Sequence, residues 1–103
     1  MTEAGVLMSR DEILTLLRAH RQELENFGIG SLRLFGSMAR GEATSVSDID
    51  LLVDFSAAPT FSDYMKLRIF LEDLLGKKVD LVTETGLRPG VRPFVEKDAI
   101  RVA

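Results

Sequence analysis

The chain contains no cysteine, which excludes disulfide bonds, thiol catalysis and cysteine-ligated zinc. It has one histidine, His20, which stands among arginines in an expected helix, so we interpret it as a solvated helix position rather than a catalytic group. No apolar run has the length needed to cross a membrane, and residues 1–5 lack the start of a signal peptide. We therefore expect a cytoplasmic protein that has no membrane partner.

A dense basic tract is also lacking. The chain has 13 Lys and Arg against 16 Asp and Glu, for a net charge of −3, which argues against direct binding of nucleic acid. Its 103 residues are 46% apolar and show no repeat and no long linker. We expect one domain over residues 1–103.

Two aspartates stand at the start of an apolar run. Asp48 and Asp50 flank Ile49, and residues 49–53 have the length and composition of a strand. Side chains two residues apart on a strand point to the same face, so both carboxylates would lie together and attract a divalent cation such as magnesium. Asp48 as a simple turn cap is the competing interpretation, but it would leave Asp50 unexplained.

A glycine-serine turn precedes these acids. Gly36-Ser37 follows the apolar run 32–35, and the glycine would let backbone approach a phosphate closely while the serine adds donors. Residues 38–40 could start a short helix, with Arg40 holding a further phosphate oxygen. As alternatives, the pair could be an ordinary tight turn, and the arginine could pair with a neighbouring acid such as Glu42.

A third acid lies within a later apolar run. Asp80 is part of residues 77–83, which follow a helix expected to end at Gly76. If this strand pairs beside the first two acids, it could complete a site for two metals and take a proton from an attacking hydroxyl. A solvated acid on an edge strand is the alternative. Asp54 and Glu84 are further acids near strand ends, and we consider them as alternatives to Asp80.

These segments together resemble the minimal nucleotidyltransferases of the DNA polymerase β-like superfamily. The motifs that carry the resemblance are residues 36–41, 47–53 and 79–82. It covers about residues 30–83 by motif and nearly the whole chain by length and element order, and the fixed spacing makes it specific. It implies an α/β (α+β) fold of the small polymerase β-like kind, with a mixed sheet packed with helices.

The resemblance also implies roles for single residues. Asp48, Asp50 and Asp80 match the family's catalytic, metal-binding acids, which would hold two Mg²⁺ ions. The glycine-serine pair would bind the phosphates of ATP, and Arg40 matches a position that is often basic.

Many members of this family are encoded beside a small helical ribonuclease toxin called HEPN and act as its antitoxin by transferring AMP from ATP to a toxin tyrosine. The resemblance implies that this chain is such a magnesium-dependent protein adenylyltransferase with a HEPN-type partner. Larger relatives use an added helical region to hold the base and the acceptor, and no residues remain here for one. We therefore expect a partner to complete the site, in a homo- or hetero-oligomer.

Two other functions stay open on the sequence. One is a non-catalytic antitoxin that neutralises its partner by covering it. The other is a nucleotidyltransferase acting on a small molecule such as an aminoglycoside, which the missing second region disfavours. The sequence does not identify the acceptor residue, the number of AMP units or the preferred nucleotide.

Local signals predict an alternating order of helices and strands. A capping box of Ser9 and Glu12 would start a helix that continues to Phe27, and Thr60 with Asp63 would cap another. A last short helix is expected over residues 93–99, ending in 100–102. The order and direction of the strands cannot be derived from these signals.

Overall fold

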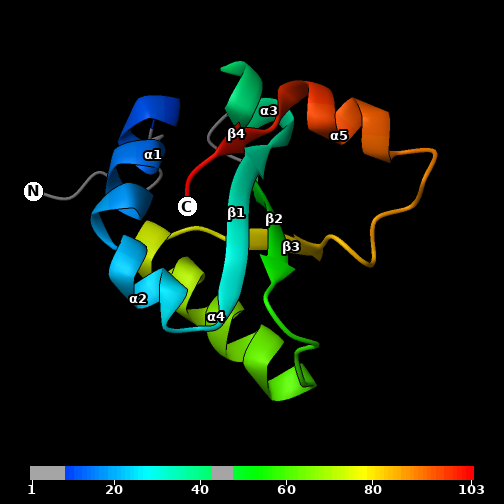
Figure 1. Cartoon of the computed structure of the whole chain (residues 1–103). Helices are drawn as coiled ribbons and strands as arrows, with labels where there is room; N and C mark the ends of the chain where they lie inside the picture. The colour runs from blue at the N-terminus through cyan, green and yellow to red at the C-terminus, as the bar shows by residue number, and fades with distance from the viewer. Residues whose placement is uncertain (1–8, 43–47) are drawn as a thin grey trace, which may run out of the picture.

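The computed structural model describes residues 9–42 and 48–103 of the chain (Figure 1). No helix of this described part is long and apolar enough to span a membrane. The elements follow in the order α1 (Arg10–Ala19), α2 (Arg21–Glu25), β1 (Ile29–Phe35), α3 (Gly36–Arg40), β2 (Ile49–Phe55), α4 (Phe61–Leu75), β3 (Val79–Thr83), α5 (Arg92–Asp98) and β4 (Ile100–Arg101).

The strands form one mixed sheet in the order β3-β2-β1-β4. β1 pairs antiparallel with both β2 and β4, whereas β2 and β3 run parallel. The parallel pair is connected through α4, the kind of crossover that parallel strands need. The expected mixed sheet packed with helices is therefore confirmed, and the strand order that the sequence left open is now defined.

The two faces of the sheet differ in composition because alternate side chains point to opposite sides. One face packs against α1, α2 and α4 and forms the main core. In Figure 1, α1 and α2 lie on one side of β1 and α5 on the other. Its strand residues are Ile29, Leu32, Leu34, Ile49, Leu51, Val53, Val79 and Leu81.

The opposite face carries Asp50 and Asp80 at one end and Leu52 in the middle. Leu52 is fully buried, and Val95 of α5 is buried with 6% of its surface exposed. Both residues lie outside the main core cluster. Because α5 packs against α3 and β1, we infer that it covers the middle of this second face. The end that carries the two acids is left more open, with Asp50 half-buried and Asp80 exposed.

Helix boundaries follow the local signals in most places. The capping box of Ser9 and Glu12 is present at α1, and Thr60 with Asp63 forms another at α4. Gly76 ends α4 in the left-handed conformation that glycine adopts without strain. The predicted short helix after the glycine-serine pair is α3.

Two predicted elements were wrong in extent. The first helix does not continue unbroken to Phe27 but is interrupted at His20, whose ring nitrogen Nδ1 bonds the Leu16 carbonyl oxygen at 2.9 Å. This half-buried ring also meets Phe70 edge to face, so the position is less solvated than expected.

The end of the chain also differs from the expectation. Residues 100–101 are not a helix end but form β4 beside β1, and Val102 and Ala103 are buried. The backbone N–H of Val102 donates to the Leu32 carbonyl at 2.8 Å. Two strand residues are too few for a periodic signal, so tertiary pairing decided this element.

Leu51 tests the central packing because it is 0% exposed and lies between Leu34 on β1 and Leu81 on β3. We expect Leu51→Ala to lower the free energy of unfolding by about 2–5 kcal/mol through lost burial and a residual cavity. Ile69→Ala on α4, where the side chain is 51% exposed, should change it by less than about 1 kcal/mol. Urea denaturation measures both, and equal losses would contradict the described core.

Candidate active site

Three segments that are distant in the sequence meet at one edge of the sheet. β1 ends at Phe35, which lies opposite Asp50 near the start of antiparallel β2. Asp50 in turn stands beside Asp80 near the start of parallel β3. The strand register therefore brings the glycine-serine turn and two of the three predicted acids together. Ser47, which belongs to the recognised motif, lies outside the described residues.

Asp48 precedes β2 and is exposed, so the two-residue alternation of a strand does not by itself fix its direction. Its charge nevertheless acts on Asp50, whose pKa it raises. All three predicted acids thus belong to one electrostatic neighbourhood.

Gly36 packs directly against the Asp50 side chain. Its φ is +75°, a conformation that favours glycine. A Cβ atom at this position would lie 3.1 Å from Cγ and 3.2 Å from Cβ of Asp50, and closer still to Oδ2. The sequence argument assigned this glycine to phosphate approach, and the structure adds that any larger residue would displace the carboxylate.

The pKa of the Asp50 carboxyl is raised from 3.8 to about 6. Burial is the largest cause, followed by the negative charges of Asp80 and Asp48 and a hydrogen bond with Asp80. The positive charge of Arg40 partly opposes the shift. A half-buried carboxylate among like charges is costly to ionise, and a bound cation would relieve that cost.

Arg40 makes two ion pairs at the end of α3. Its Nε donates to Glu42 Oε1 at 2.9 Å and its Nη1 to Asp98 Oδ2 at 3.1 Å. The pairing with Glu42 that the sequence offered as an alternative is therefore present. Asp98 was not foreseen, because it lies on α5, distant in the sequence. The predicted role of this arginine in phosphate binding stays a prediction. The same holds for Ser37, whose backbone carbonyl accepts a hydrogen bond from the Glu42 N–H at 2.9 Å.

Comparison with known proteins assigns the family. A sequence model of the nucleotidyltransferase domain matches residues 17–102. The chain belongs to the minimal nucleotidyltransferase family. It is 40% identical over 97 residues to the protein adenylyltransferase MntA of Thermococcus cleftensis, covering 93% of this chain and 98% of that protein.

Solved structures agree with this assignment. A structure provisionally named a minimal nucleotidyltransferase superposes with a TM-score of 0.80 at 41% identity, covering 90% of this chain and 95% of that one. A chain of the complex between the tri-AMPylated HEPN toxin of Shewanella oneidensis and its MNT antitoxin gives a TM-score of 0.65 at 19% identity, covering 87% and 71%. At that identity the likeness shows the fold alone. The chain is thus a nucleotidyltransferase enzyme by family.

The described residues of this nucleotidyltransferase contain no group of three or more His, Cys, Asp or Glu side chains already arranged to hold a metal ion. The donor chemistry nevertheless fits magnesium, because the neighbouring groups are hard carboxylate oxygens with concentrated negative charge. Asp80 is already hydrogen-bonded to Asp50, and Asp48 is exposed, so the Asp48 side chain has room to turn toward Asp50. The three-acid ligand set stays a prediction.

The substitute acids lie elsewhere. Glu84 forms ion pairs with Arg33 and with Arg92 Nη1, the latter at 2.7 Å, and the Arg92 pairing is the main cause that lowers its pKa. Asp54 is exposed near the end of β2, opposite Ser31. Both are at the opposite ends of β2 and β3 from Asp50, so neither replaces Asp80 at the predicted metal site.

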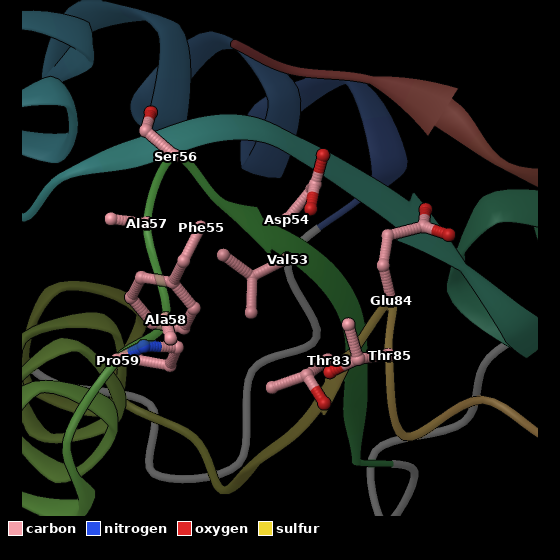
Figure 2. A pocket seen from close by; sticks show the side chains of 10 residues that line it. All are labelled: Val53, Asp54, Phe55, Ser56, Ala57, Ala58, Pro59, Thr83, Glu84 and Thr85. Atoms are coloured by element: carbon pink, nitrogen blue, oxygen red, sulfur yellow. The ribbon is translucent and has the colours of Figure 1, made fainter.

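A cavity of about 270 Å³ lies at that opposite end of the sheet. Its lining comes from residues 53–59 and 83–85, whose side chains are shown in Figure 2. The two substitute acids, Asp54 and Glu84, are part of this lining, whereas the predicted metal-binding acids, the glycine-serine pair and Arg40 are not. The hollow is therefore separate from the carboxylate edge of the nucleotidyltransferase.

Gly36→Ala tests the contact with Asp50. Gly76 is the matched control because its φ is +67° and nothing lies within 4 Å of an added Cβ. We expect Gly76→Ala to cost about 1 kcal/mol of unfolding free energy from backbone strain alone. Gly36→Ala should cost about 2–4 kcal/mol, because displacement of the carboxylate adds to the strain.

The excess cost should vanish when Gly36→Ala is introduced into an Asp50→Ala chain, which no longer has the obstructing carboxylate. Chemical denaturation of the four variants measures this coupling. An excess that persists without the Asp50 side chain would contradict the described contact.

The raised pKa of Asp50 predicts a pH-dependent stability. The folded chain holds this proton more tightly than the unfolded chain, so stability falls as pH rises from about 4 to about 6. Asp50→Asn removes the charge, so this variant should have a higher melting temperature than the unaltered chain above pH 6. The gain should disappear near pH 4, where both carry no charge at this position. Thermal unfolding of both chains in chelator-containing buffer from pH 4 to 8 measures this difference. A difference in melting temperature that stays constant over this range would contradict the prediction.

Proposed function

We propose that this minimal nucleotidyltransferase transfers AMP from ATP to a tyrosine hydroxyl of a HEPN-type toxin and thereby acts as its antitoxin, with Mg²⁺ as the required ion. The observation that carries the proposal is the convergence of Asp50, Asp80 and Gly36 at one edge of the sheet. Such an edge presents carboxylates for a metal ion beside a turn at which backbone comes close to a phosphate.

Relatives support the choice of reaction and partner. The Thermococcus cleftensis protein is named a protein adenylyltransferase, and the chain covers nearly all of its length. One structural neighbour is an MNT antitoxin complex that contains a tri-AMPylated HEPN toxin, and another is a toxin-antitoxin structure with AMP-PNP. An ATP analogue and an AMPylated protein partner are thus found with this fold.

In the proposed reaction the three acids divide two tasks. Asp48 and Asp50 hold the ion, which would neutralise charge developing on the phosphate oxygens when bound. Asp80 accepts the proton of the acceptor hydroxyl, since it is exposed and lies beside Asp50. The acceptor oxygen bonds to the α-phosphorus, the bond to the bridging oxygen of the β-phosphate breaks, and pyrophosphate leaves.

Co-expression with the product of the neighbouring gene, the candidate toxin, tests the proposal through the intact mass of that product. The unaltered chain should add AMP-sized increments, and Asp48→Asn with Asp50→Asn should add none because metal binding is lost. Asp54→Asn is the matched control, since it removes an exposed acid from the same strand, four residues beyond Asp50. It should leave the increments unchanged.

Three results would contradict this function. Retained transfer by the double variant would remove the assigned role of the two acids. A toxin that co-purifies with the chain and shows no mass change would favour an antitoxin that acts by covering its partner. Nucleotide transfer to a free small molecule alone would favour the small-molecule reaction.

A further inference from the structure

Arg40 is held by acids from two different parts of the chain. Glu42 is its near neighbour in sequence, and its side chain is 65% exposed. Asp98 is 58 residues away and 24% exposed. The two bonds engage Nε and Nη1, and Nη2 takes part in neither. A guanidinium bonded at two nitrogens has a fixed plane, which directs its remaining donors.

Asp98 stands on an anchored helix. At the start of α5, Arg92 binds Glu84 through a carboxylate contact of 2.7 Å and a backbone carbonyl contact of 3.1 Å. Val95, in the middle of the helix, is buried. Its last residue is Asp98. A side chain on an element fixed in this way positions a partner better than one on a loop.

The helix that ends in Arg40 lies beside the carboxylate edge. α3, which ends at Arg40, packs against β1, β2 and α5. Gly36, the first residue of the same helix, lies against the Asp50 side chain. The contact with Asp98 therefore restrains a positively charged side chain on the helix that borders the predicted metal-binding acids.

We propose that Asp98 is a positioning residue that holds the Arg40 guanidinium at the carboxylate edge, so that the arginine can bind the nucleotide phosphates. The purpose given to the arginine rests on the proposed function, whereas its restraint by Asp98 does not. The inference adds α5 to the machinery of the site, although no recognised motif includes this helix.

The local pair with Glu42 cannot supply the same restraint. Arg40 ends α3 and Glu42 follows it two residues later, so their pairing does not tie that segment to the rest of the molecule. Exposed ion pairs contribute little to folding, so removal of the Asp98 charge should leave the protein folded. Its effect on orientation can then be separated from any effect on stability.

The test compares Asp98→Asn with Glu96→Gln, an equivalent change on the same helix whose partner is Arg92. The first readout is the heteronuclear NOE of the Arg40 Nε–Hε signal, assigned by its absence in Arg40→Lys. The second is the affinity for AMP-PNP with Mg²⁺, and the third is the KM for ATP and the kcat of AMP transfer. Melting temperature is recorded for every variant.

We expect Asp98→Asn to lower the NOE of this signal, weaken AMP-PNP binding and raise KM for ATP by about 10-fold, with little change in kcat or melting temperature. Glu96→Gln should change none of these. In an Arg40→Ala chain, Asp98→Asn should have no further effect on affinity, because the positioned group is gone.

An unchanged NOE in Asp98→Asn would overturn the proposal whether or not the chain transfers AMP. Unchanged AMP-PNP binding by Asp98→Asn would also overturn it. Tighter binding by this variant would overturn it as well, because it would show that Asp98 keeps Arg40 away from the nucleotide. If the unaltered chain transfers no AMP to any partner, the proposed function fails, and the NOE and AMP-PNP affinity still decide the role of Asp98.

Discussion

The pairing of β2 with an antiparallel strand on one side and a parallel strand on the other is the constraint on which the site depends. Antiparallel pairing places the end of β1 beside the start of β2, and parallel pairing places the start of β3 there as well. Asp50 consequently has Phe35 on one side and Asp80 on the other. Because side chains alternate along a strand, a slip of one residue would turn Asp50 into the apolar core and dismantle the edge.

This arrangement concentrates negative charge at a place where the charge does not stabilise the fold. Asp50 is half-buried against Gly36 and among acids, and its pKa is raised to about 6 as a result. Groups in such surroundings are often functional, because the same environment that destabilises a lone carboxylate favours a bound cation. The positive charge of Arg40, at the end of α3, partly opposes this effect, and its side chain is bonded to Asp98 of α5.

The sequence predicted those features that short-range rules control. Capping boxes at Ser9 and Thr60, the helix end at Gly76 and the strand-turn-helix around Gly36 all depend on residues within four positions of one another. Features that depend on long-range pairing were missed. β4 forms only because β1 offers it an edge, and the contact between Asp98 and Arg40 joins elements 58 residues apart. The close packing of Gly36 on Asp50 likewise requires the register, which no local pattern contains.

The most direct measurement is a crystal structure of the chain with Mn²⁺ and AMP-PNP, with manganese located by its anomalous scattering. Manganese accepts the same oxygen ligands as magnesium. We expect manganese on the carboxylates of Asp48 and Asp50, with the nucleotide α-phosphate beside it and the Gly36 turn at the phosphates. Manganese and nucleotide bound instead in the cavity lined by residues 53–59 and 83–85 would contradict it.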